Sequence, residues 1–149
     1  MELQTVTVGH VLSQKGRTVF SIGPEASVYE ALEVMARCKV GALLVMEGER
    51  LVGIFSERDY ARKVALYGHN SRNTPVREMM SAQVHTVSED TCLLAAMETM
   101  TERHFRHLPV LTDGRVTGIV TIGDVVKAVI ETQQRTIEHL SGYIAGNLA

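Results

Sequence analysis

Two short stretches of the sequence place a hydroxyl three residues ahead of a carboxylate, directly after an apolar run. They are Ser56-Glu57-Arg58-Asp59 and Thr121-Ile122-Gly123-Asp124. Each is typical of a capping box, in which hydroxyl and carboxylate satisfy free N–H groups at a helix start. A carboxylate projecting from a first helical turn into a cleft can also accept two hydrogen bonds from a vicinal diol such as ribose. The N–H groups and hydroxyl beside it can bind phosphate oxygens. The residues alone leave both interpretations open.

The other residues that could take part in catalysis or bind a metal form no recognisable catalytic or metal-binding group. His104 and His107 have an HxxH spacing, but they fall across a helix end and a strand start, where the rings do not converge. No Cys or third acid stands nearby, so we expect no metal. The chain also lacks a nucleophile–base pair and a phosphate-cradling glycine loop. We therefore expect a protein that is not an enzyme.

The elements that position these residues occur twice. Shifted by 65 residues, Val19–Val64 lies over Val84–Val129 without a gap, and Gly53, Ile54 and Asp59 fall on Gly118, Ile119 and Asp124. The register holds through the turns, which indicates a duplicated unit. We divide the chain into repeat 1 with an N-terminal helix (9–67), a linker helix with repeat 2 (68–131), and a helical tail (132–149).

Each repeat has the pattern of a strand, a helix, a hairpin of two strands and a second helix. We expect first strands at Val19–Ile22 and Val84–Val87, and helices that start near Ser27 and Thr91. Gly-containing turns join the hairpin strands, which we expect at Ala42–Met46 with Leu51–Phe55 and at His107–Leu111 with Val116–Val120. The apolar strands need cover on both faces, so the repeats must pack together.

Composition excludes several classes of function. The formal net charge of the 149 residues is -2 and the charges are interspersed, whereas a nucleic-acid binder shows a basic stripe. We expect no nucleic-acid partner. No apolar run is long enough to span a membrane and the N-terminus does not resemble a signal peptide. Cys38 and Cys92 have no CxxC spacing, which favours a reducing compartment. We expect a cytoplasmic protein that does not bind membranes.

The repeated stretches resemble a known family. Gly53–Asp59 and Gly118–Asp124 are similar to the CBS-domain pattern of Gly, two apolar residues, Ser or Thr, two variable residues and Asp. Arg106-His107-Leu108-Pro109-Val110 is similar to the second-strand pattern of the same family. The resemblance implies an α/β (α+β) fold of two βαββα repeats, related by a pseudo-twofold axis in one Bateman module. It also implies a stand-alone regulatory protein of bacterial or organellar type.

The resemblance further implies adenine-nucleotide clefts between the repeats, with AMP, ADP, ATP, NAD or S-adenosylmethionine as the regulatory ligand and no catalytic cofactor. In CBS domains the motif Asp binds the ribose, a role that falls here on Asp59 and Asp124. The other implied ligand-binding residues are the motif residues Ser56, Arg58, Thr121 and Gly123, first-strand residues Thr18, Phe20, Gln83 and His85, second-strand residues Val40, Gly41, Ala42, Phe105, Arg106 and His107, and third-strand residues Ile54 and Ile119.

Two functions from different classes follow. The first is a signal-transduction module that binds a nucleotide and changes its contacts with a regulated protein, whose identity the residues do not reveal. The second is a dimeric scaffold with weak or empty clefts. For either one the resemblance implies a homodimer, with the helices that start near Ser27 and Thr91 as its apolar surface. Because repeat 2 has Arg106-His107 where repeat 1 has Gly41-Ala42, we expect the two clefts to differ.

Overall fold

The computed structural model describes residues 2–148, with side chains described for residues 3–142. Repeat 1 consists of β1 (Ser21–Ile22), α3 (Val28–Cys38), β2 (Ala42–Glu47), β3 (Arg50–Ser56), α4 (Glu57–Asp59) and the π-helical turn η1 (Tyr60–Ala65). Repeat 2 consists of β4 (Val87–Ser88), α6 (Leu93–Arg103), β5 (His107–Thr112), β6 (Arg115–Thr121) and α7 (Ile122–Leu148). Helices α1 (Glu2–Thr5) and α2 (Val8–Lys15) precede repeat 1, and α5 (Val76–Met79) precedes repeat 2. The predicted pair of βαββα units is confirmed.

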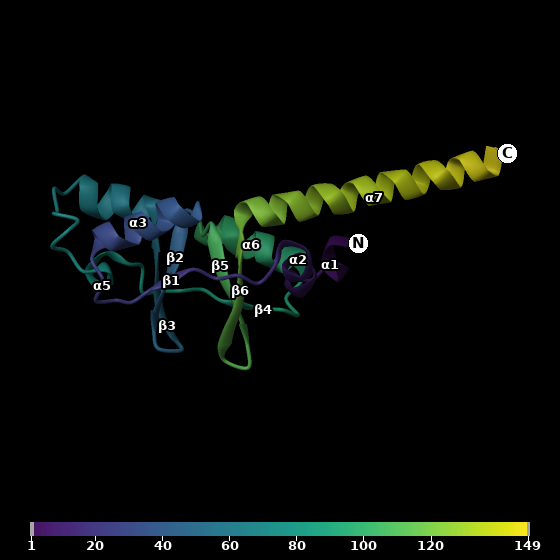
Figure 1. Cartoon of the computed structure of the whole chain (residues 1–149). Coiled ribbons are helices and arrows are strands. Elements are labelled where there is room, and N and C mark those ends of the chain that lie inside the picture. Colours follow the sequence, from purple (N-terminus) through teal and green to yellow (C-terminus); the bar gives the residue numbers. More distant parts are fainter. Residues whose placement is uncertain (1, 149) are drawn as a thin grey trace.

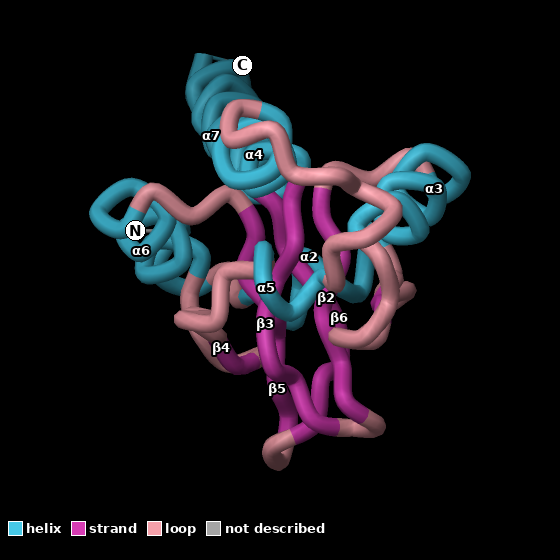
Figure 2. Tube along the Cα trace, turned by 90° about the vertical axis from the view of Figure 1, so that its left-hand side faces the viewer, coloured by secondary structure: helices cyan, strands magenta, loops and turns pink. Residues whose placement is uncertain are grey.

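Each repeat contains a three-stranded mixed sheet. In repeat 1 the order is β1-β2-β3, with β1 parallel and β3 antiparallel to β2, and β4-β5-β6 repeat this arrangement. Even the irregularity in the hairpin is duplicated, because the register shifts at Val45/Met46 and again at Val110/Leu111. The strands of both repeats run side by side through the middle of the molecule, with helices around one end (Figure 2).

The first strands are shorter than the sequence predicts. Only Ser21 and Ile22 pair with β2, and in repeat 2 the paired residues are Val87 and Ser88, which overlap the predicted strand only at Val87. In this register Phe20 lies opposite Leu43, and Leu44 N–H donates to Phe20 O at 3.1 Å, so the chain ahead of β1 still follows β2. In repeat 2 the counterpart of Leu44 is Pro109, which has no N–H to donate, so the equivalent bond cannot form.

The short helices that precede the two repeats are exchanged in space. The apolar residues Val8, Val11 and Leu12 of α2 lie in the core of repeat 2, among Leu93 and Leu108. Backbone bonds fix this placement, since Val8 N–H donates to Thr91 O at 2.8 Å. In the same way Val76 and Met79 of α5 lie in the core of repeat 1 with Val28 and Phe55. Each repeat is therefore completed by the helix that precedes the other repeat in the chain.

Two glycines allow these helices to approach the sheets. A Cβ placed on Gly118 of β6 would lie 2.7 Å from Leu12 Cδ1, and one on Gly53 of β3 would lie 2.5 Å from Met80 Sδ. A carbon–carbon contact is favourable only near 3.5–4.0 Å, so a larger residue would push the helix away. These glycines are the first residues of the repeated motif, and here they serve close packing.

Helix α7 runs beyond the rest of the molecule (Figure 1). Within the described residues, no helix combines the length and apolar character needed to cross a membrane. The large exposed apolar side chains of α7 are Ile122, Val126, Ile130, Ile137 and Leu140, while none of this kind belongs to α3 or α6. The expected apolar surface on α3 and α6 therefore lies on α7 instead.

Candidate functional site

Both motif carboxylates form the capping boxes that their spacing predicts. Ser56 N–H donates to Asp59 Oδ2 at 3.0 Å, and Asp59 N–H donates to Ser56 Oγ at 3.1 Å. The bonds of Thr121 and Asp124 are equivalent, at 2.8 and 3.1 Å. Each Asp is thus held at the start of a helix that follows a buried strand. Capping uses mainly one carboxylate oxygen, so the surroundings of the other decide what else each Asp can bind.

Asp59 is nearly buried, with only 8% of its surface exposed. Its Oδ1 accepts a hydrogen bond from Ser81 Oγ at 3.0 Å and lies 3.2 Å from Lys63 Nζ. Ser81 reaches this position because the chain after α5 pairs with β3, where Ile54 and Ser81 exchange two backbone bonds of 2.8 and 3.0 Å. Both partners of Oδ1 are polar side-chain ends that an incoming hydroxyl pair can replace.

A cavity of about 640 Å³ opens beside Asp59. The cavity brings together residues of both repeats. Asp59 of repeat 1 lines it together with the segment just before β4 and the segment that leads into β5 of repeat 2. Among the predicted site residues, the cavity is lined by Gly41, Ile54, Ser56, Arg58, Asp59, Gln83, His85, Phe105, Arg106, His107 and Thr121. The sequence left open which strands face which Asp, and this cavity gives the pairing for Asp59.

The cavity has an aromatic wall and a cationic rim. The rings of His85 and Phe105 stack with centroids 6.2 Å apart and planes at 26°. The lining carries five cations against two acids, Glu57 and Asp59, the cations being Arg58, Arg62, Lys63, Arg103 and Arg106. A flat apolar surface beside a concentration of positive charge suits a ligand with an aromatic group and an anionic group.

Sequence reasoning missed several lining residues, namely Glu57, Arg62, Lys63, Ser81, Val84, Arg103, His104 and Ile122. Lys63 follows Asp59 by four residues, a spacing that places both on one helix face and that predicts this contact. Arg103 ends α6 and Ser81 follows α5, so nothing in the local sequence indicates that either lies near Asp59. In the described part of the chain, no group of three or more His, Cys, Asp and Glu is arranged to hold a metal.

His107 lies deep in the site. Its Nε2 is 3.9 Å from the position of a Cβ on Gly41, next to the Glu57 carboxyl. Burial lowers the pKa of His107, and the charges of Lys15 and Arg106 lower it further, while Asp124 and Glu57 act in the opposite direction. The imidazole is therefore neutral near neutral pH and can serve as hydrogen-bond donor and acceptor.

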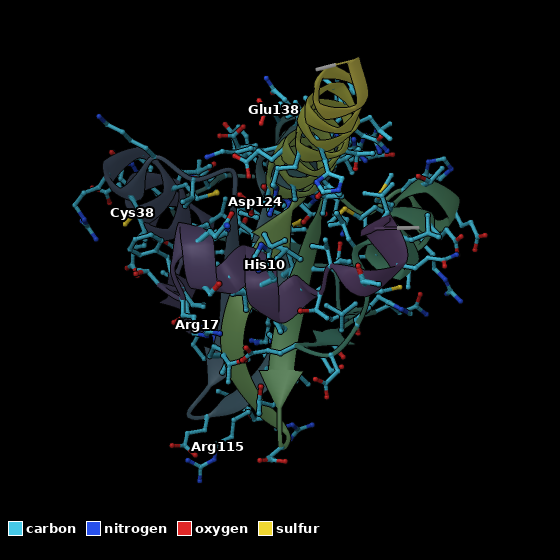
Figure 3. All side chains as sticks on the ribbon, turned by 90° about the vertical axis from the view of Figure 1, so that its right-hand side faces the viewer. His10, Arg17, Cys38, Arg115, Asp124 and Glu138 are labelled. Atoms are coloured by element: carbon cyan, nitrogen blue, oxygen red, sulfur yellow. The ribbon has the colours of Figure 1, made fainter. Side chains whose placement is uncertain are left out.

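Asp124 has different surroundings. The Lys15 ammonium, at the end of α2, donates to Asp124 Oδ2 and also to Ile119 O at 2.9 Å. In Figure 3 Asp124 lies at the base of α7 next to α2, which carries His10. Burial acts to raise the pKa of Asp124, but the bonds from Lys15 and Thr121 outweigh it and hold the pKa below its usual range. Lys15 and the Thr121 N–H thus share the capping oxygen Oδ2, and Lys15 also binds the third-strand carbonyl of this repeat.

The remaining predicted residues, Thr18, Phe20, Val40, Ala42, Ile119, Gly123 and Asp124, do not line the Asp59 cavity. By the 65-residue shift, Thr18 and Phe20 are the counterparts of Gln83 and His85, and Ile119 is the counterpart of Ile54. Thr18 and Phe20 are exposed, whereas Ala42 is buried in its strand. By the same shift, the counterpart of the Asp59 surroundings is the region around Asp124, where Lys15 lies.

Comparisons with known proteins agree with this architecture. The CBS domain family model matches residues 8–66 and 76–131. The mitochondrial CBS domain-containing protein CBSX3 of Arabidopsis thaliana is 36% identical over 152 residues, which cover 96% of this chain and 74% of that protein. The crystal structure of the CBS domain protein NE2398 is 48% identical with a TM-score of 0.80, covering 83% and 97% of the two chains.

A more distant structure, 24% identical with a TM-score of 0.71, covers 80% of this chain and 89% of its own. It is the CBS domain protein PAE2072 from Pyrobaculum aerophilum, complexed with AMP. The duplicated βαββα units, the repeated Gly-to-Asp motif and the match of the family model to both repeats lead to one conclusion. The chain belongs to the CBS-domain family, and its two CBS repeats form a Bateman module.

Proposed function

We propose that this protein is a regulatory module that binds an adenine nucleotide in the cavity beside Asp59. The observation that carries the proposal is the composition of that one cavity, which combines a buried carboxylate, two stacked rings and five cations. A nucleotide has a vicinal diol, an aromatic base and phosphates, and each part has a complementary group there. The residues of this cavity do not identify the protein that the module regulates.

The ribose hydroxyls bind to Asp59 Oδ1 by replacing Ser81 Oγ and the Lys63 ammonium, which lie 3.0 and 3.2 Å away. Charge-assisted hydrogen bonds of this kind are stronger than neutral ones. The base lies against His85 and Phe105. The phosphates extend toward Arg58 and Arg106, with the N–H groups after Ser56 close by.

The complex of PAE2072 with AMP supports this class of ligand, since that protein shares the fold. AMP is therefore the first ligand to test, and ADP, ATP, NAD and S-adenosylmethionine share its adenosine. The cleft around Asp124 binds more weakly in our proposal, because a ligand there must first displace Lys15.

The second candidate function is a dimeric scaffold in which the clefts stay empty. The observation that favours it is the ion pairing of both carboxylates, each of which already has a lysine partner. In both functions the protein is a homodimer without catalytic activity that acts in the cytoplasm. The free thiols of Cys38 and Cys92 support a reducing compartment for this proposal.

Calorimetric titration of AMP and of adenosine into the wild type, Asp59→Asn and Glu30→Gln distinguishes these functions. Glu30 is the matched control, because its N–H is capped by Ser27 as that of Asp59 is capped by Ser56, yet it lies on α3. Asp59→Asn should weaken AMP binding about ten- to a hundredfold, and Glu30→Gln should leave it unchanged. Equal affinity in all three proteins would leave capping as the only role of Asp59.

Thermal denaturation tests the ligand class independently. A ligand at a hundred times its dissociation constant stabilises the fold by about 2.7 kcal/mol, which raises the melting temperature by about 5–10 °C. We expect such a rise with at least one of the adenosine compounds. If millimolar AMP, ADP, ATP, NAD and S-adenosylmethionine all leave the melting temperature unchanged, the scaffold is the correct function.

A further inference from the structure

The outer part of α7 packs little against the rest of the described chain. Thr132 is the last buried residue among the described side chains of this helix, with 2% exposure. From Gln133 to Gly142 every described residue is exposed except the half-buried Thr136. An isolated helix of about 15 residues is marginal in water. The outer half of α7 therefore gains much of its stability only when another surface covers it.

Four of the five large exposed apolar residues described for α7 form a single seam. Val126, Ile130, Ile137 and Leu140 are 51%, 57%, 63% and 55% exposed. With Gln133 they follow spacings of four, three, four and three residues, which is the a/d pattern of a heptad repeat. In this pattern Ile130 and Ile137 occupy a positions. Ile144, whose side chain lies outside the described residues, continues the a positions in sequence.

The residue types on the seam favour a second copy of the same helix. A β-branched residue at a combined with Leu at d, as with Ile137 and Leu140, is typical of a parallel two-stranded coiled coil. Gln133 at a central d position can bond to its own counterpart only when the two helices are parallel and in register. A polar core residue of this kind specifies register at some cost in stability.

The distribution of charge agrees with self-association. Glu131, Arg135, Glu138 and His139 of the outer half occupy b, f, b and c positions, which point away from the seam. The flanking e and g positions from 134 to 141 hold only Gln, Thr and Ser. Two identical helices can therefore approach without like charges facing each other. In Figure 3, which looks along α7 from its far end, the labelled Glu138 lies beside the helix on the side away from the strands.

We propose that α7 pairs with α7 of a second copy as a parallel two-stranded coiled coil through Val126, Ile130, Gln133, Ile137 and Leu140. The face of α7 that packs on its own body, at Val125 and Thr132, is separate from this seam. Both bodies can therefore lie beside the same coiled coil. This interface does not depend on nucleotide binding.

Light scattering and sedimentation of the full chain test the interface. The wild type should have twice the monomer mass of 16.4 kDa at micromolar concentration. Ile137→Glu places two carboxylates in the seam and should weaken the dimer about a hundredfold or more. His139→Glu is the matched control on the outer face and should leave the mass unchanged. Because Ile137 is 63% exposed in the single chain, its substitution should not unfold the body.

A disulfide trap tests the orientation. In a Cys38→Ser, Cys92→Ser background, Gln133→Cys should form a covalent dimer on mild oxidation, because parallel helices in register bring the two positions together. Arg135→Cys, on the outer face, should not. A monomeric wild type, or a dimer that Ile137→Glu does not weaken, would overturn the proposal. A dimer that fails to cross-link through residue 133 would overturn the parallel arrangement.

Discussion

The contact between Lys15 and Asp124 distinguishes the second cleft from the first, and Lys15→Met tests what it contributes. Met retains most of the aliphatic stem, so the substitution removes mainly the ammonium. Two hydrogen bonds are lost, one to Asp124 Oδ2 and one to Ile119 O. Asp124 keeps its bond from Thr121 N–H at 2.8 Å, and the capping box survives.

The magnitude follows from burial. The side chains of Lys15 and Asp124 are 29% and 22% exposed, so the pair lies between a surface ion pair and a buried one. Exposed pairs contribute at most about 1 kcal/mol, and breaking a buried pair costs about 3–5 kcal/mol. We expect Lys15→Met to reduce the free energy of unfolding by about 1.5 kcal/mol, which lowers the melting temperature by about 3–6 °C.

Urea denaturation of Lys15→Met, Asp124→Asn and the double variant measures the coupling. If the pair interacts as described, the double variant loses less stability than the sum of the single variants, by roughly 0.5–1.5 kcal/mol. Lys127→Met, at an exposed position of α7, controls for the loss of one positive charge. Additive effects of the two substitutions would refute the reasoning.

The pH dependence of folding stability provides a second test of the interaction between Lys15 and Asp124. Because the folded pKa of Asp124 is depressed, its contribution is present above the unfolded pKa of about 4 and is lost as pH falls through the folded pKa. The stability difference between the wild type and Lys15→Met should therefore be full at pH 7 and should shrink below about pH 4. A difference that stays constant down to pH 3 would contradict this assignment.

Three further predictions concern packing, protonation and ligand access. Gly118→Ala should cost about 1–3 kcal/mol in urea denaturation, because the new methyl group meets Leu12, whereas Gly123→Ala, whose nearest neighbouring atom is 3.6 Å away, should not destabilise the fold. Equal effects would show that α2 can move aside. Since the pKa of His107 is lowered, the unfolded chain takes up this proton first, and stability should fall as pH drops from about 7.5 through 6.5. His107→Gln should reduce that fall in a pH series of unfolding curves, and an unchanged slope would show that other groups cause it. Under the proposed function Lys15→Met should let adenosine bind at the second cleft, which titration would detect as a second site; a stoichiometry that stays at one would show that Lys15 is not what closes that cleft.

Much of the fold follows from local sequence. The 65-residue repeat, the hairpins of β2–β3 and β5–β6 and both capping boxes depend on residues close together in the chain, through apolar periodicity, tight turns and hydroxyl–carboxylate spacing. The length of the first strands did not follow, because strand composition does not show which residues form ladder bonds; Leu44 N–H donates to Phe20 O, whereas its counterpart Pro109 has no N–H. Val84–Val87 therefore has strand composition, although the pairing involves Val87 and Ser88.

The site was decided by the tertiary structure. Lys15 and Asp124 are 109 residues apart, and they meet only because α2 packs in the core of repeat 2 instead of repeat 1. The apolar pattern of α2 is satisfied equally by either core, so the sequence of the helix cannot determine which one it enters. The same exchange places Ser81 against Asp59, and the packing of the two repeats brings Arg103 into its cavity. Local spacing therefore determined which carboxylates cap the helices. The packing of α2 and α5 in the exchanged repeats determined what surrounds each carboxylate, because the core that a short helix enters depends on the fit of the whole core.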